Sequence, residues 1–453
     1  MRGGDLLDLA DRISRMAGRA GADAAEALLE WSHEIEIKVV GGRLERTTEA
    51  VDLGCGLRVQ KRGCPGFAST TDLSADGLRA LVDAALAIAA RVDADESASL
   101  PDPAPGVPPS LELLDPRLED LPWDDALSLA RRVEEGALAA GPAVKPGEGS
   151  AFARARGAVA VASTRGVRAA YEGSHCLLRS APVAQSGSER QRQTWHEGRR
   201  FLADLPAPEE VGAAAARRAL GMIGARTIAP GRYPVIFDAP QATRFWSGLA
   251  PALLGDSARR RISFLADDLG RAIASPSVTL VDDACVDRAY GSRPFDAEGL
   301  PARRVLLIDG GVLAGFLYDT RTARRASAVS TASAQRGYGS PPWPGAHALH
   351  LVPGEASHDD LLREAGRGLY VTGLLGFGVN LSTGDYSRGA NGWWFEEGRI
   401  AHPVHEVTIS GNLRDLLKRI SRVGADLVRR SAHASPEFLI DAMTISGGRE
   451  GSA

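Results

Sequence analysis

The spacing of apolar residues at the start of the chain changes along its length. Residues 6–16 place apolar side chains at a helical period, which predicts an amphipathic helix. Residues 34–39 alternate between charged and β-branched side chains, which predicts a half-buried strand, and Gly41-Gly42 after them predicts a hairpin. Two further strands and a helix capped by Ser74 are expected next. The pattern therefore predicts a helix, a β-meander and a second helix.

A second block of similar order follows a proline-rich stretch. Residues 94–110 contain five prolines, and proline donates no backbone hydrogen bond, so this stretch is expected to be a linker. Beyond it, the pattern predicts a helix over 124–140 and strands from 149 to 195. An alanine-rich helix is expected to end the block near Ala225.

The second half of the chain contains mainly strand patterns. Residues 233–239 form a short apolar run that is typical of a buried strand. Asp309-Gly310-Gly311 lies between two apolar runs and predicts a hairpin. Short helices are expected before Gly366 and over 412–420.

The order of these elements predicts an α+β fold with antiparallel sheets, because strands outnumber helices and the helices cluster between runs of strands. We expect three domains. An N-terminal α/β domain covers 1–108 and ends in the proline-rich linker. A middle α+β domain covers 112–226, and a large C-terminal, antiparallel β-rich domain with flanking helices covers 229–450.

Composition excludes several classes of function. The 453 residues carry a formal net charge of −4, whereas a nucleic-acid-binding protein usually has a basic excess. No run of about 18 apolar residues is present, so no membrane span is expected. The four cysteines are scattered, as in a reduced protein, and the N-terminus lacks the apolar core of a signal peptide. These features predict a soluble, cytoplasmic protein.

Histidines and cysteines form no catalytic pattern in the sequence. His196 is next to Glu197, but the zinc-peptidase helix needs a second histidine close behind, so a surface pair is expected. His347 and His350 are three apart on a predicted strand and would point to opposite faces. An autonomous hydrolase that uses Ser, Cys or Asp has no supporting constellation.

The segment 382–394, STGDYSRGANGWW, concentrates polar groups between glycines. Asp385, Tyr386, Ser387 and Arg388 offer an acceptor, a ring, a hydroxyl and a fork donor, and Asn391 adds an amide. Two interpretations remain open. The segment is a turn whose polar groups bond one another, or it is a cleft loop that contacts the backbone of a ligand.

A second unusual segment is 245–261, FWSGLAPALLGDSARRR. It begins with apolar residues at near-helical spacing, but Pro251 falls inside it. Residues 245–254 include no ionisable side chain. The segment is either plain packing or a position from which chemistry is missing.

Two stretches closely resemble the TldD/TldE (PmbA) family. Residues 372–420 resemble its C-terminal signature, and residues 39–59 resemble its first domain. The resemblance implies an N-terminal α/β domain, a middle domain and a large β-rich C-terminal domain. It also implies an activity: TldD and TldE chains pair into a hollow heterodimer that acts as a zinc metallopeptidase on peptides and unfolded segments. The TldD chain holds the zinc through an HExxxH helix and a later cysteine, and TldE chains lack those ligands.

The resemblance also locates the metal-helix positions in this chain. Residues 253–256, LLGD, resemble the end of the TldD-like metal helix, so the two histidine positions fall on Trp246 and Pro251 and the glutamate position on Ser247. Indole and pyrrolidine rings give a metal no lone pair, and serine is no carboxylate base. Cys285 is the last cysteine, so the late ligand is missing too. We therefore expect a TldE/PmbA-like member with no metal or other cofactor, and zinc in a TldD-like partner.

Two hypotheses follow for the role of the chain. In the first, it is the non-catalytic subunit of a TldD/TldE-type peptidase and binds peptide or unfolded polypeptide, with residues 383–392 facing the chamber. In the second, it is a self-associating peptide-binding scaffold, for instance a homodimer. A permanent interface of either kind should bury more than roughly 2,000 Å².

Overall fold

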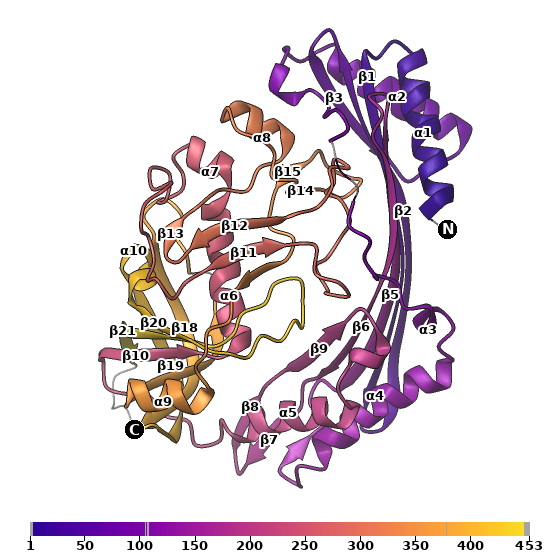
Figure 1. Cartoon of the computed structure of the whole chain (residues 1–453). Coiled ribbons are helices and arrows are strands. Elements are labelled where there is room, and N and C mark those ends of the chain that lie inside the picture. The colour runs from indigo at the N-terminus through magenta and orange to yellow at the C-terminus, as the bar shows by residue number, and fades with distance from the viewer. Residues whose placement is uncertain (1–2, 105, 107, 377, 448–453) are drawn as a thin grey trace.

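Two six-stranded sheets dominate the computed structural model, which describes residues 3–104, 106, 108–376 and 378–447 (Figure 1). Their strand orders are β3-β2-β1-β5-β6-β9 and β10-β17-β18-β19-β21-β20. Among named strands of the described residues, β10 and β17 pair in parallel and the other pairs are antiparallel. The predicted α+β class is confirmed.

The first sheet combines strands from the first two segments of the chain. β1 pairs with β2 on one side and, over residues 26–39, with β5 on the other. Gly41 and Gly42 have φ of +60° and +75° and make the predicted β1–β2 turn, where residues other than glycine would be strained. The strands of the first sheet are β1 (Ala24–Val40), β2 (Arg43–Lys61), β3 (Cys64–Thr70), β5 (Ser150–Ser163), β6 (Arg168–Ser180) and β9 (Trp195–Arg199).

Helices cover the first sheet near its two ends (Figure 1). At one end, Leu6 and Ile13 pack with Leu29 and Leu57 into one buried cluster. At the other end, Val133 and Val211 belong to a second cluster with strand residues of β1, β5 and β6. The helices and short elements of this half are α1 (Gly3–Arg19), α2 (Ala75–Ala89), η1 (Glu96–Ala98), α3 (Pro116–Glu119), α4 (Trp123–Leu138), β4 (Val144–Lys145), β7 (Val183–Ser186), β8 (Glu189–Arg192), η2 (Leu202–Asp204) and α5 (Pro208–Leu220).

The second sheet encloses the largest apolar cluster together with helix α6 and the smaller sheet β13-β12-β11-β16, and β14 and β15 form a separate pair. The elements of this half begin with β10 (Gly231–Phe237), α6 (Ala239–Leu249), η3 (Ala250–Leu253), α7 (Gly255–Arg259), β11 (Leu280–Asp283), β12 (Arg304–Asp309), β13 (Val312–Leu313), α8 (Thr320–Arg325), β14 (Ala334–Gln335), β15 (Trp343–Pro344) and β16 (Leu349–Leu351). They continue with α9 (His358–Ala365), β17 (Gly368–Leu375), β18 (Asp385–Glu396), β19 (Arg399–Asn412), α10 (Leu413–Leu416), η4 (Leu417–Arg419), β20 (Ile420–Val423) and β21 (Phe438–Gly447). No helix of the described residues is long and apolar enough to cross a membrane.

Three sequence predictions about element limits were wrong. The alanine-rich helix ends at Leu220 and not near Ala225, because the ring of Trp393 packs against Gly221. The helix expected over 412–420 has one α-turn and one 3₁₀ turn, since Ile420 already pairs with β21. Residues 385–392, expected as a turn or loop, belong to strand β18.

Buried polar contacts connect the first sheet to the C-terminal half. Glu26 on β1 binds the guanidinium groups of Arg58 and Arg336, and both partners of the Glu26–Arg336 pair are fully buried. Arg200, at the end of β9, donates hydrogen bonds to the carbonyl groups of Ala289, Tyr290 and Ser292. These contacts fix the C-terminal half against the first sheet.

Candidate functional site

Helix α6 carries the positions that the sequence analysis assigned to a missing metal site. Asp238 caps this helix, because its side chain accepts a hydrogen bond from the backbone N–H of Gln241 at 2.8 Å. The α-helix ends at Leu249 and continues as a 3₁₀ turn that contains Pro251. Proline has no N–H to donate to the preceding turn, so the α-helix cannot run through this position.

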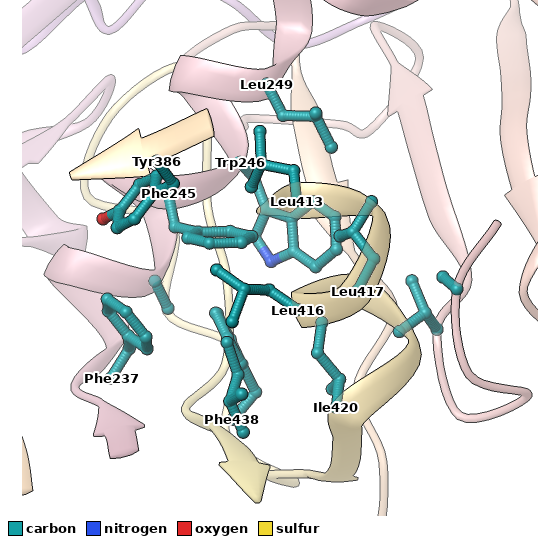
Figure 2. Packing of buried hydrophobic residues seen from close by; sticks show 14 of the residues in the cluster. Phe237, Phe245, Trp246, Leu249, Tyr386, Leu413, Leu416, Leu417, Ile420 and Phe438 are labelled. Carbon is teal, nitrogen blue, oxygen red and sulfur yellow. The ribbon is translucent and has the colours of Figure 1, made fainter. Parts of the chain in front are cut away.

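Trp246 lies inside the core of the C-terminal half (Figure 2). It is 1% exposed, and its ring centroid lies 5.3 Å from Phe245 and 5.9 Å from Phe438. Ser247 is half-buried and donates its hydroxyl to the Thr243 carbonyl one turn earlier, at 2.8 Å. Of the residues that the sequence analysis compared with a metal helix, Trp246 is therefore engaged in core packing and Ser247 in a local hydrogen bond. Within the described residues, no group of three or more His, Cys, Asp or Glu side chains is placed to hold a metal.

The residues proposed for ligand contact lie along β18 and do not form one cluster. Asp385 is exposed and accepts hydrogen bonds from the Thr383 hydroxyl at 2.6 Å and the Asn412 amide at 3.0 Å, which lower its pKa. Ser387 is exposed, and Arg388 donates through Nε to the Gly376 carbonyl at 3.0 Å. Asp385 and Arg388 therefore bond polar groups of neighbouring segments as well as Thr383, and they do so from strand β18.

Tyr386 and Asn391 have different surroundings. Tyr386 is 2% exposed, its ring lies 5.4 Å from Phe245, and burial raises its pKa. Its side chain belongs to the core and faces away from Asp385 and Ser387, since side chains alternate along a strand. Asn391 lies six residues beyond Asp385, about 20 Å along the strand at 3.4 Å per residue. It lines a cavity that the other four residues do not reach.

This cavity, which we call the inter-sheet cavity, has a volume of about 570 Å³ and lies between the two large sheets. Its walls come from the β8–β9 segment, α5, the first two turns of α6, strands β17 and β18, and the loop before β21. Its lining residues are Arg192, Gln193, Thr194, Trp195, His196, Arg218, Pro240, Gln241, Thr243, Arg244, Thr372, Gly373, Leu374, Leu375, Asn391, Val428, Arg430, Ser431 and His433.

The lining of the inter-sheet cavity is cationic. It contains four arginines and no aspartate or glutamate. Two of the arginines, Arg218 and Arg430, lie over the Trp195 ring, at 4.8 and 4.9 Å from its centroid. Burial raises the pKa of Asp238, which lies behind Arg218, while the arginine 2.8 Å away lowers it.

Sequence reasoning missed most of this cavity. It named His196 and Glu197 as a surface pair; His196 is exposed, but Glu197 is 5% exposed and is bound to Arg430, so that prediction was half wrong. Arg192, Arg218 and Arg244 come from β8, α5 and α6 and Arg430 from a distant loop, and no local spacing signals their approach. Of the residues that line the cavity, the sequence analysis had named His196 and Asn391, and the segment 245–261 begins one residue after Arg244.

Two large, mostly antiparallel sheets with a cavity between them define a multidomain α+β protein. Sequence models of three PmbA/TldA metallopeptidase domains match the chain: domain 1 over residues 25–89, the central domain over 116–223 and the C-terminal domain over 230–447. The chain belongs to the PmbA/TldA metallopeptidase family.

Relatives and solved structures agree with this assignment. The metalloprotease PmbA of Escherichia coli O157:H7 is 33% identical over 435 residues, which cover 94% of this chain and 93% of that protein. A solved structure described as a putative modulator of a DNA gyrase, from Thermotoga maritima MSB8, matches with a TM-score of 0.88 and 27% identity, over 97% of this chain and 99% of that one. TldE from Thermococcus kodakarensis matches in fold, with a TM-score of 0.87 and 23% identity, over 97% of this chain and 100% of that one.

Proposed function

We propose that this chain is the non-catalytic, TldE/PmbA-like subunit of a cytoplasmic two-chain zinc metallopeptidase. In that role it completes the chamber and binds unfolded peptide, while a TldD-like partner supplies the zinc. The observation that carries the proposal is the content of α6 and the 3₁₀ turn after it, where Trp246 and Pro251 stand at the positions that we assign to the two histidines and Ser247 at that of the glutamate.

Zinc catalysis explains why these positions matter. A catalytic zinc site needs about three protein ligands and leaves one position for water, which a base then deprotonates. Trp246 is buried in the core, Pro251 offers an alkyl ring, and the Ser247 hydroxyl is bonded to its own helix. The residues present do not fit a zinc ion, so no step of peptide hydrolysis is assigned to this chain.

The inter-sheet cavity supports the peptide-binding part of the proposal. Thr243 and Arg244, on α6, line it, so the cavity borders the helix that would carry zinc in a TldD-like chain. A peptide held in this cavity would lie beside α6, the helix that corresponds to the zinc-binding helix of a TldD-like chain.

Co-purification tests this function. The tagged chain is purified with and without a co-expressed TldD-like chain, and zinc content and cleavage of an unfolded peptide are measured for each sample. We expect a stable complex, with zinc and cleavage in the complex only. Stoichiometric zinc together with peptidase activity in the isolated chain would refute the proposal. If the chain stays a homo-oligomer although the partner is present, the self-associating scaffold replaces it.

A further inference from the structure

The arginines that line the inter-sheet cavity differ in how their charges are balanced. Three of the four form an ion pair with a carboxylate that lies outside the lining, so these pairs add little net charge to the cavity. The pairs are Arg218 with Asp238, Arg430 with Glu197 and Arg192 with Glu148.

Arg244 is the exception. It is exposed on the second turn of α6, and Nη1 donates to the Leu374 carbonyl at 3.2 Å. Among the described residues, no carboxylate lies within 4.0 Å of its guanidinium group, so Arg244 gives the cavity an unbalanced positive charge. Its remaining N–H groups suit a carboxylate, which matches the fork geometry of a guanidinium.

Two amide side chains in the wall of the cavity have acceptors that no described residue uses. Gln241 is 6% exposed; its Nε2 donates to the Thr372 carbonyl at 3.2 Å, which fixes the orientation of the amide. Its Oε1, like Oδ1 of Asn391, is buried and accepts no hydrogen bond from the described residues. A buried acceptor without a donor is unfavourable, so a ligand that brings N–H groups is favoured here.

We propose that the inter-sheet cavity binds a carboxylate group of an extended peptide, with Arg244 as the anchoring cation and with Gln241 and Asn391 accepting hydrogen bonds from the peptide backbone. The inference rests on the proposed function, because it names the chemistry of the peptide that this subunit takes. The carboxylate belongs either to the C-terminus of the peptide or to an Asp or Glu side chain.

The two kinds of group in the cavity distinguish a peptide from other anions. A phosphodiester backbone or inorganic phosphate satisfies Arg244 but brings no N–H for Gln241 and Asn391. A neutral peptide brings N–H groups but leaves Arg244 unpaired. A peptide with a free carboxylate satisfies both, in a cavity of about 570 Å³ that has room for a few residues.

Calorimetric titration of the full chain tests the inference with three N-acetylated Gly-Ser octapeptides. One has a free C-terminal carboxylate, the second is its C-terminal amide, and the third is the amide with two central serines replaced by glutamate. We expect the first, the third or both to bind about tenfold more tightly than the neutral amide, as a charge-assisted contact predicts. The peptide that binds more tightly than the neutral amide shows which carboxylate is recognised.

The variant Arg244→Gln should lose this preference and bind all three peptides like the neutral one. Because Arg244 is exposed, the substitution leaves the core intact. Arg271→Gln is the matched control, since this arginine lies outside the cavity with a side chain 71% exposed, and it should keep the preference. Equal binding of all three peptides by the natural chain overturns the inference and leaves peptide binding standing. Binding of none overturns both, and tighter binding of a thymidine hexanucleotide replaces the peptide with a nucleic acid.

Discussion

Trp246 shows how a single residue changes what a helix can do. On α6 its indole packs against Phe245 and Phe438, in the largest apolar cluster of the described residues (Figure 2). A ligand for a metal would have to leave this cluster and reach solvent. Trp246 therefore contributes to the packing of the core, and we expect its substitution to lower the free energy of unfolding.

The substitution Trp246→Ala should lower the free energy of unfolding by about 3–5 kcal/mol, because it leaves a large cavity in a close-packed core. Urea unfolding followed by circular dichroism measures the effect. Ser247→Ala, on the next residue, is the control and should cost less than about 1 kcal/mol, since its hydroxyl only bonds its own helix. A change below about 1 kcal/mol for Trp246→Ala would contradict the core position.

The sequence shows which side chains a strand carries, but it does not show which of them are buried. The alternation along 382–394 could not show that Tyr386 is buried while Asp385 is exposed, because which face of a strand is covered depends on distant segments. Trp394 and Phe395 are consecutive and both buried, because they pack into two different apolar clusters, Trp394 in the large cluster around α6 and Phe395 in a smaller one with Leu361 and Leu362 of α9. The alternation of a strand cannot show that both of its faces are covered.

Among the elements, hairpins and caps were predicted well because they depend on neighbouring residues. Ser74 accepts the hydrogen bond from Gly77 that its sequence context predicted, and Gly366 ends α9 with φ of +66°. Short strands were harder. β11 and β16 have four and three residues, and Asp282 connects them by accepting the amides of His347 at 2.9 Å and Ala348 at 2.6 Å.

Asp282 makes this pairing depend on pH. Burial raises its pKa to about 6, although the amides of His347 and Ala348 lower it. The same carboxyl titrates near 3.9 when the chain is unfolded. Since the folded pKa is the higher one, the stabilising contribution is full below about pH 4 and is lost as the pH rises through 6.

The variant Asp282→Asn removes this titration. The free energy of unfolding of the natural chain minus that of the variant should fall by about 3 kcal/mol between pH 4 and pH 7. Urea unfolding of both proteins at the two pH values measures the difference. Asp309→Asn, at an exposed position on β12, is the control, and its difference should change little. A difference that stays constant for Asp282→Asn would show that the carboxyl titrates normally.

At the scale of the whole molecule, buried charges connect parts of the chain that lie far apart in sequence. Arg58 binds Glu26 at 3.1 Å and Glu298 at 3.0 Å, and Arg336 binds Glu26 from the other side. Burial alone would raise the pKa of Glu26, but Arg336 and Arg58 hold it below its usual value. Composition and local pattern could not predict this network, because its members are separated by up to 310 residues.

Removing the charge of Glu26 should therefore loosen the attachment of the C-terminal half. Glu26→Gln is expected to cost about 3–5 kcal/mol at pH 7, because it leaves the buried Arg336 without its carboxylate and Arg58 with Glu298 alone. The cost should shrink below about pH 4, since a carboxylate with a lowered pKa stabilises the fold only while it is ionised. Urea unfolding at both pH values provides the measurement. Glu36→Gln, which breaks an ion pair with the exposed Arg46, should stay within about 1 kcal/mol.

The pairing of β1 with β5 has a consequence for the synthesis of the protein. Residues 26–39 must wait for residues 150–163, which leave the ribosome more than a hundred residues later. At about 5–20 residues per second, β1 has an unpaired edge for roughly 5–30 s. Such an edge is a template for association with other chains, so the growing polypeptide needs protection during that interval. The first sheet, which holds the two halves together, is thus also an element that the growing chain can complete only late in its synthesis.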